Sequence, residues 1–308
     1  MRVIVLFAGQ GYANENLYDL LLSDEQGKVW LDEFQKVNDF NYIEMAEKIR
    51  NPKYSQVLIS SYQLGLFSIL KPLLAKQDVT MAGYSLGEVS AFLASCNADI
   101  QTAYKCVSKR TRLMQTVAKE GDFDLVVIKG NMNQSDIEAL CKKHHCGISI
   151  INADDHYVIG GKIDDLKKIL KHAKRVHIEY EKWLGIHIPS HTPYFLVTVD
   201  KYLKYLKKKF SSSQMEYPLI SPIALKKVFD IESEIELLSK ELCQTLHWHI
   251  VCELIPEFGF DLIIDLGPGK SMTSIFSASN AKNIPVITCS EFKSLEGLKS
   301  HIEQFISE

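Results

Sequence analysis

The 308-residue sequence predicts an α/β protein: an α/β-hydrolase-like large domain with a parallel sheet core and an inserted ferredoxin-like βαββαβ small subdomain. Three observations predict this class. Apolar runs of strand length alternate with segments that have apolar residues at helical spacing. One strand leads into Gly83-Tyr84-Ser85-Leu86-Gly87, a G-x-S-x-G turn between strand and helix. Residues 122–188 follow the order βαββαβ of ferredoxin-like units.

The first third of the chain alternates strands and helices. Residues 3–7 form a continuous apolar run, typical of a buried parallel strand, which ends in the loop Gly9-Gln10-Gly11. Apolar residues at helical spacing follow over 59–75. Residues 79–82 are the strand before the G-x-S-x-G turn, and 89–94 begin the helix after it.

The middle of the chain has shorter elements. We expect strands at 125–129, 148–152, 157–160 and 175–180, and helices at 134–143 and 163–173. Signals of the larger sheet resume at 217–220, 261–266 and 284–288. The sequence therefore predicts a small subdomain of residues 122–188 inserted in a discontinuous large domain of residues 1–121 and 189–308. We expect a cleft between the two.

Composition excludes several function classes. With 46% hydrophobic and 24% charged residues the chain can bury a large core, and a net charge of -3 without a polybasic tail argues against nucleic acid. The N-terminal apolar run is too short for a signal peptide, and no stretch approaches about 18 uninterrupted apolar residues, so we expect a cytoplasmic protein that does not enter a membrane. Seven scattered cysteines agree with a reducing compartment.

Cysteine and histidine cluster once, in Cys141, His144, His145 and Cys146. No second pair stands at the spacing of a zinc finger or ribbon, so we expect no metal.

Ser85 is the expected nucleophile. Small residues on both sides of it permit the sharp turn that exposes the hydroxyl beside backbone N–H groups. The alternative is an ordinary strand-to-helix turn that contains a serine.

A serine hydroxyl needs a base, and His191 is the expected one. It stands between Pro189 and Pro193, in a stiff turn where the chain returns from the small subdomain to the large domain, and such a junction loop is where a catalytic base is expected. His187 and His191 would be a metal pair on a helix, but Pro189 makes a continuous helix improbable.

Several motifs occur in the order seen in malonyl-CoA:acyl carrier protein transacylases, and the sequence resembles that family over nearly its whole length. They are Phe7-Ala8-Gly9-Gln10-Gly11, Gly83-Tyr84-Ser85-Leu86-Gly87-Glu88, Arg110 with Met114-Gln115, Pro189-Ser190-His191, Trp248 and Leu266-Gly267-Pro268-Gly269. The family's small subdomain also matches the βαββαβ insertion.

The resemblance implies roles for the reacting groups. Ser85 would carry the acyl group, and His191 would deprotonate Ser85 and later the incoming thiol. A main-chain carbonyl in the segment before Trp248 would orient the histidine. The backbone N–H groups of Gln10 and Leu86 would form the oxyanion hole.

The resemblance also implies substrate contacts. Arg110 would pair with the free carboxylate of a malonyl group, although by itself it would be interpreted as a solvated helix arginine. Asn152 matches a polar residue of the family's cleft. Met114 either packs on the acyl group or is a core methionine, which is the simpler interpretation.

The implied function is transfer of a malonyl group from malonyl-CoA to the phosphopantetheine thiol of an acyl carrier protein, through an acyl-serine. No cofactor is permanently bound. The alternatives are a thioester hydrolase on the same scaffold and transfer of another acyl group in a polyketide pathway. A carrier-docking subunit with a dead site is disfavoured because Ser85, His191 and Arg110 are all present.

Tyr84 departs from the histidine usual in fatty-acid synthesis enzymes of the family. Gly83-Tyr84-Ser85, residues 152–161 and Ser190-His191-Thr192-Pro193 are closer to the epsilon subunit of malonate decarboxylase or to stand-alone acyltransferases that serve polyketide synthases.

Overall fold

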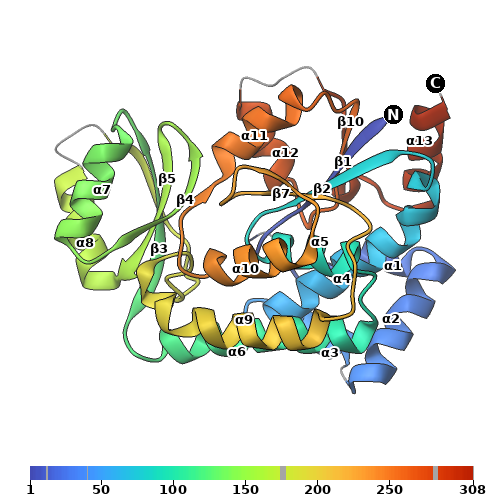
Figure 1. Cartoon of the computed structure of the whole chain (residues 1–308), viewed down its shortest axis with the longest axis horizontal. Coiled ribbons are helices and arrows are strands. Elements are labelled where there is room, and N and C mark those ends of the chain that lie inside the picture. Colours follow the sequence, from blue (N-terminus) through green and yellow to red (C-terminus); the bar gives the residue numbers. More distant parts are fainter. Residues whose placement is uncertain (12, 40, 174–177, 280–283, 308) are drawn as a thin grey trace.

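A computed structural model describes residues 1–11, 13–39, 41–173, 178–279 and 284–307. Figure 1 shows two lobes of unequal size, each built on a β-sheet. In the described part of the chain, one sheet has six strands and the other has five. The predicted fold class is confirmed.

The large sheet has the strand order β11-β10-β1-β2-β7-β8. Neighbouring strands from β11 to β7 are parallel, and the edge strand β8 runs antiparallel to β7, which the sequence analysis did not predict. The strands are β1 (Arg2–Phe7), β2 (Asp78–Gly83), β7 (Leu219–Ser221), β8 (Lys226–Val228), β10 (Leu262–Asp265) and β11 (Val286–Thr288).

Helices cover both faces of the large sheet (Figure 1). In β1, Val3 and Val5 point into one apolar cluster, and Ile4 and Leu6 point into another, as expected for a strand buried on both faces. The first cluster includes residues of α4 (Ser55–Leu70), α5 (Leu86–Ser95), α6 (Ile100–Ala118), α9 (Leu196–Phe210) and α10 (Ile231–Glu241). The second includes residues of α11 (Trp248–Glu257) and α12 (Ser271–Ala278).

The remaining helices of the large lobe lie at its periphery. They are α1 (Asp19–Leu22), α2 (Glu25–Asn38), α3 (Tyr42–Ala46) and α13 (Leu295–Ser307), with short 3₁₀ helices at Lys71–Leu74, Pro193–Phe195 and Cys289–Glu291.

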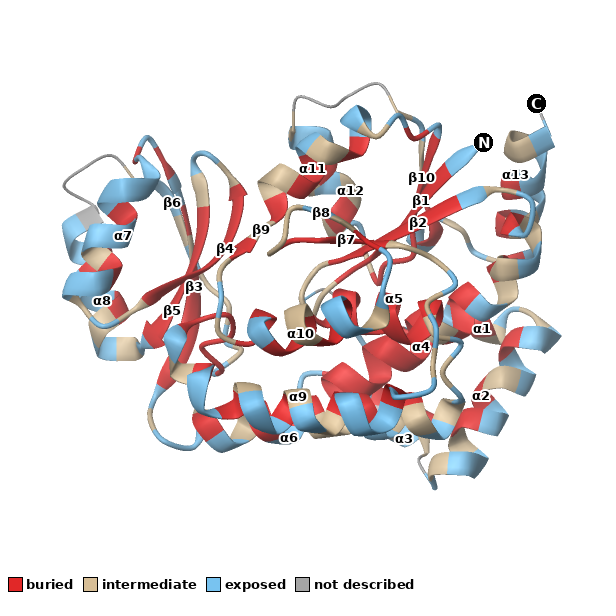
Figure 2. Cartoon of the chain, in the orientation of Figure 1, coloured by how far each residue is buried: buried red, intermediate tan, exposed pale blue. Residues whose placement is uncertain are grey.

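Helix α4 is the central helix of the large lobe. The segment Ser55–Leu74 is long and apolar enough to cross a membrane by length and composition alone, but 72% of its most apolar window is buried inside the molecule. Figure 2 shows α4 coloured as buried along almost its whole length. Its apolar composition is therefore that of a core helix.

The small sheet has the strand order β6-β3-β5-β4-β9. Its first four strands pair antiparallel, and helices α7 and α8 lie against one face of them (Figure 1). This is the expected βαββαβ arrangement. Its elements are β3 (Phe123–Gly130), α7 (Gln134–Lys143), β4 (Gly147–Ala153), β5 (His156–Lys162), α8 (Ile163–Ala173) and β6 (Ile178–Trp183).

Two details of the small sheet differ from the expectation. The strand expected at 175–180 begins outside the described residues, and the described strand continues to Trp183. The short strand β9 (Leu246–His247) comes from the C-terminal part of the chain and pairs parallel with β4. This pairing connects the small sheet to the segment that leads into α11.

Candidate active site

The connection between β2 and α5 is a sharp turn that carries Ser85. The serine has φ 59° and ψ −111°, in the strained backbone region found at nucleophile turns. A Cβ at Gly87 would lie 1.9 Å from the carbonyl oxygen of Phe7, and a Cβ at Gly83 would lie 2.0 Å from the backbone nitrogen of Glu88. Only glycine lets the turn pass this close to the end of β1.

Both lobes line a cavity of about 1510 Å³, and Ser85 is in its wall. The volume exceeds the roughly 300–1,000 Å³ common for small-ligand pockets. Every candidate site residue from the sequence lines this one cavity: Gln10, Ser85, Leu86, Arg110, Met114, Asn152 and His191.

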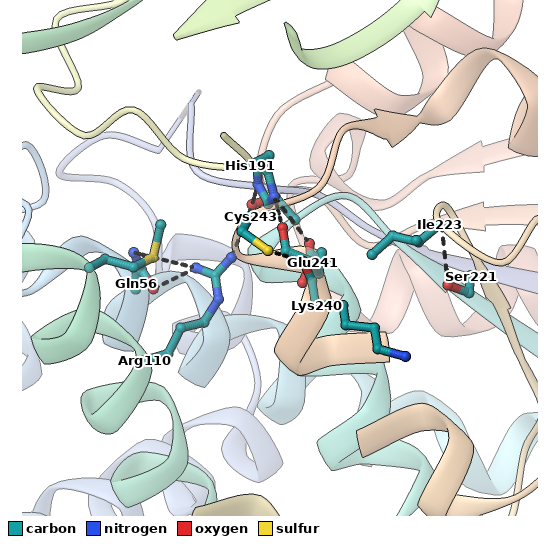
Figure 3. Close-up of polar contacts among 10 residues, drawn as sticks. Gln56, Arg110, His191, Ser221, Ile223, Lys240, Glu241 and Cys243 are labelled. Atoms are coloured by element: carbon teal, nitrogen blue, oxygen red, sulfur yellow. Dashed lines mark hydrogen bonds and ion pairs between the residues drawn. The ribbon is translucent and has the colours of Figure 1, made fainter. Parts of the chain in front are cut away.

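His191 lies between Ser85 and the end of α10. Its Nε2 is 2.7 Å from Ser85 Oγ, and its Nδ1 is 2.6 Å from the carbonyl oxygen of Glu241 (Figure 3). A carbonyl only accepts, so the hydrogen-bond pattern assigns the proton to Nδ1 and leaves Nε2 to accept from the serine. The carbonyl belongs to the segment before Trp248, where the resemblance implied one.

The environment keeps the imidazole neutral. The pKa of His191 is lowered to about 3: burial is the largest cause, the positive charge of Arg110 acts in the same direction, and the hydrogen bond to Glu241 opposes both. At neutral pH the ring is therefore an unprotonated acceptor next to the serine hydroxyl.

Arg110 comes from α6 and is 1% exposed. Its Nη2 donates to Ser85 Oγ at 3.2 Å, and its Nη1 donates to Gln56 Oε1 at 2.9 Å and to Met114 Sδ at 3.2 Å (Figure 3). Among the described residues no carboxylate oxygen lies within 4.0 Å of it. The interpretation as a solvated helix arginine is wrong: Arg110 is a buried cation next to the nucleophile, which favours binding of an anion there.

Two loops bring backbone groups to the same cavity. Leu86 is the first residue of α5, where a helix has N–H groups without partners in its own backbone. The side-chain amide of Gln10 donates to Ser55 Oγ at 2.7 Å, so its polar end is held by α4. Gln10 and Leu86 thus approach the cavity from the ends of β1 and β2.

Asn152 lies across the cavity, at the end of β4, and is 8% exposed. Its Oδ1 accepts a hydrogen bond of 3.1 Å from the Tyr84 hydroxyl, and its Nδ2 is 3.4 Å from His156 Nε2. The Tyr84 ring packs edge-on against Trp248, with ring centroids 5.3 Å apart. Met114 is buried at 2% exposure, as expected for a core methionine, yet it also contacts Arg110.

Two residues that contact this site were not assigned to it from the sequence, although a main-chain carbonyl before Trp248 was expected. Gln56 fixes one end of the Arg110 guanidinium and is 1% exposed; a glutamine within the apolar run of α4 was the available signal. Glu241 orients His191 through its main chain, and its side chain is also fully buried. Nothing in the local pattern distinguishes Glu241 from the exposed glutamates of α10.

Cysteines and histidines form no site for metal in the described ranges. No group of three or more His, Cys, Asp or Glu residues there is arranged to hold a metal ion.

Known proteins resemble this chain over nearly its whole length. No protein-family model matches the chain. A malonyl CoA-acyl carrier protein transacylase of Buchnera aphidicola subsp. Schizaphis graminum is 23% identical over 299 residues, which cover 94% of this chain and 95% of the relative. Over nearly its whole length the chain is therefore similar to malonyl-CoA:acyl carrier protein transacylases.

Solved structures of this family share the fold. The malonyl-CoA:acyl carrier protein transacylase of Helicobacter pylori superposes with a TM-score of 0.90 at 21% identity, over 100% of this chain and 99% of that one. A malonyl-transacylase solved in complex with a type II PKS acyl-carrier protein gives 0.87 at 20% identity, over 99% and 100%.

Proposed function

We propose that this chain transfers the malonyl group of malonyl-CoA to the phosphopantetheine thiol of an acyl carrier protein. The observation that carries the proposal is a buried guanidinium, that of Arg110, 3.2 Å from the hydroxyl of a serine–histidine pair. A cation in that position can pair with the free carboxylate of a malonyl thioester while Ser85 attacks its other end. A neutral acyl group offers Arg110 no carboxylate to pair with.

In the first half-reaction, His191 Nε2 takes the Ser85 proton as Oγ attacks the thioester carbonyl. The backbone N–H groups of Gln10 and Leu86 hold the resulting oxyanion. When the intermediate collapses, the C–S bond breaks, the CoA sulfur receives the proton from His191, and malonyl-Ser85 remains. Throughout, the Glu241 carbonyl holds the Nδ1 proton and stabilises the imidazolium.

In the second half-reaction, the carrier thiol replaces CoA. His191 takes the thiol proton, the sulfur attacks the Ser85 ester, and the same oxyanion site is used again. Ser85 Oγ leaves and recovers the proton from His191. The enzyme returns to its starting state, and no bound cofactor takes part in either half-reaction.

The shape and charge of the cavity fit both substrates. Its volume accommodates an extended pantetheine arm. Besides Arg110, four cationic side chains line it and can attract the phosphates of CoA or of the carrier's prosthetic group: Arg50, Lys129, Lys182 and Lys270. The family relatives named above are malonyl transacylases, and one was solved with an acyl-carrier protein. We propose the same partner here, and a cytoplasmic location in agreement with seven free cysteines.

We also propose that the chain is divided into a small subdomain, residues 122–188, and a large domain, residues 1–121 and 189–308. Residues of both line the cavity. The resemblance of residues 152–161 to malonate decarboxylase and polyketide subgroups stays a prediction.

Intact-mass measurement after incubation with malonyl-CoA tests the function. We expect a malonyl adduct on the wild-type protein and none on Ser85→Ala. Absence of the adduct on the wild type at every pH, or its persistence on Ser85→Ala, contradicts the mechanism. Adding a holo-carrier protein then separates transfer from hydrolysis: transfer moves the adduct to the carrier, whereas a hydrolase releases malonate and CoA without a carrier.

A further inference from the structure

Three glutamates from two helices are buried beside the active site. Glu88 belongs to α5, which begins at the nucleophile turn, and Glu234 and Glu241 belong to α10. Each is 0% exposed. The carboxylate oxygens of Glu234 and Glu241 have no hydrogen-bond partner in the described part of the chain, whereas Glu88 has the Ser221 hydroxyl beside it. Buried carboxyls with so few partners are costly to ionise.

The three carboxyl groups interact with one another, and two of them, Glu88 and Glu241, also interact with Arg110. The pKa of each is raised, to about 7 for Glu241, to about 8 for Glu234, and well above the usual value for Glu88, and burial is the largest cause; the other causes, already included in these values, come from neighbouring groups. Repulsion from Glu241 raises the pKa of the other two, and the positive charge of Arg110 lowers the pKa of Glu88 and Glu241. The cluster therefore shares its protons and holds only part of its possible charge near neutral pH.

Other ionisable groups around the cluster do not supply a positive charge. The Nδ1 of His191 is 4.0 Å from Glu241 Oε1, but burial and Arg110 lower the pKa of His191 and keep it neutral. Burial raises the pKa of the neighbouring tyrosine and cysteines, so they are neutral as well, and Asp230 adds repulsion on Glu234. These neighbours are Tyr202, Cys106, Cys96 and Asp230.

Among the described residues around the cluster, Arg110 thus supplies the positive charge, and the three glutamates can supply the negative charge that balances it. A guanidinium at 1% exposure needs a counter-charge nearby, even without direct contact. Glu241 Oε1 lies 4.0 Å from His191 Nδ1, and the pKa of Glu241, about 7, is lower than that of Glu234, about 8. Glu241 is therefore the member best placed to be ionised when the site is empty.

We propose that Glu241, within the cluster of Glu88, Glu234 and Glu241, carries the counter-charge of Arg110 in the empty enzyme and takes up a proton when the malonyl carboxylate binds. The inference rests on the proposed function, since it needs an acidic acyl group at Arg110. Once the substrate carboxylate pairs with the guanidinium, a second negative charge in the same interior is no longer balanced. One proton then moves from the solvent to a glutamate, and no covalent bond to carbon, nitrogen or sulfur changes.

This makes Glu241 a specificity-determining residue of malonyl loading. When a substrate carboxylate pairs with Arg110, Glu241 no longer has to balance the charge of the guanidinium. An acetyl group has no carboxylate and leaves that balance unchanged. Linkage fixes the sign of the pH effect: binding that takes up a proton weakens as pH rises. Below the pKa of the cluster the glutamates are already protonated, so the uptake disappears at acidic pH.

Isothermal titration calorimetry of Ser85→Ala, which cannot form the ester, measures the uptake directly. The heat of malonyl-CoA binding is compared near neutral pH in buffers with different ionisation enthalpies, because the slope gives the protons taken up. We expect net uptake with malonyl-CoA and none with acetyl-CoA, which carries the same CoA phosphates. The dissociation constant for malonyl-CoA should rise by up to tenfold for each pH unit above about 7.

Glu241→Gln in the Ser85→Ala background should remove most of the proton uptake and flatten the pH dependence. Glu236→Gln is the matched control, because Glu236 lies on the same helix with its side chain 46% exposed. It should leave both readouts unchanged. Glu234→Gln provides a second test within the cluster if Glu241→Gln does not fold, and it should lower the uptake as well.

Equal proton uptake with malonyl-CoA and acetyl-CoA, or full uptake in a folded Glu241→Gln variant, overturns the inference. Tight malonyl-CoA binding without any uptake also overturns it and leaves the proposed function intact. A Ser85→Ala protein that binds malonyl-CoA no more tightly than acetyl-CoA instead contradicts the role of Arg110, and the proposed function fails with it.

Discussion

The hydroxyl of Tyr84 donates a hydrogen bond of 3.1 Å to Oδ1 of Asn152, and this bond joins the nucleophile turn of the large sheet to strand β4 of the small sheet. Tyr84 precedes the nucleophile directly, and its ring is held against Trp248. The bond therefore fixes the distance between the two walls of the cavity next to Ser85.

Tyr84→Phe removes this bond and keeps the ring packing. We expect a loss of about 1 kcal/mol in the free energy of unfolding, the usual net worth of such a bond. We also expect a several-fold higher KM for malonyl-CoA, because Asn152 loses the donor that orients its amide. Urea denaturation and steady-state kinetics measure the two effects.

Tyr180→Phe is the control for this change, because Tyr180 is 45% exposed on β6. A double-mutant cycle with Asn152→Ala should show that the two changes do not add, as expected for direct partners. Fully additive effects would mean that the bond contributes nothing to either property.

Arg110→Ala should reduce malonylation of Ser85 far more than acetylation. Truncating one partner of a buried charge pair costs roughly 2–5 kcal/mol, and an acetyl group never makes that pair. Initial rates of adduct formation by mass spectrometry, with malonyl-CoA and acetyl-CoA in parallel, give the ratio. Arg112→Ala, on the exposed side of the same helix, should change neither rate. Equal losses for both acyl groups in Arg110→Ala would assign the arginine a structural role.

The reactivity of Ser85 in the free enzyme should persist at acidic pH. A general base acts in its neutral form, so the rate falls only when the pH drops through the pKa of that base. Burial and Arg110 lower the pKa of His191 to about 3. The rate of Ser85 modification by a neutral sulfonyl fluoride should therefore stay nearly flat down to about pH 5, rather than halve near the usual histidine pKa of about 6.5. An inflection of the modification rate near pH 6.5 that disappears in His191→Ala would mean that the imidazole has the pKa of an exposed histidine, and it would contradict this prediction.

The sequence predicted those parts of the molecule that depend on local pattern. Helices α7 and α8 begin and end at the expected residues, because their apolar periodicity and flanking turns are local signals. The position of Ser85 followed from the strand, the glycines and the helix around it. The antiparallel edge strand β8 and the crossing strand β9 escaped prediction, because two- and three-residue strands are defined by their partners.

The residues of the candidate site likewise differ in whether the local sequence could predict them. Arg110 appeared as one cation among Lys105, Lys109 and Arg112, and only the packing of α6 against α4 shows that it is buried beside the nucleophile. Glu241 has neighbours typical of an exposed helix, and its burial results from the docking of α10 next to His191. Residues whose role depends on contacts between distant segments carry no local signal.

Gly87→Ala should disrupt the nucleophile turn and with it the large lobe. The added Cβ would lie 1.9 Å from the Phe7 carbonyl oxygen, and that oxygen belongs to a strand held by hydrogen bonds on both sides. Because the obstacle is backbone in the centre of the sheet, it cannot rotate away, and we expect a loss of more than about 3 kcal/mol in stability. Gly11→Ala is the matched control, since no heavy atom of the residues that the structure describes lies within 4 Å of its added Cβ. Urea denaturation of the two variants should give a much lower midpoint for Gly87→Ala and a midpoint close to wild type for Gly11→Ala. Similar midpoints for both would mean that β1 and the turn can separate, and that the tight contact between them does not determine where Ser85 stands.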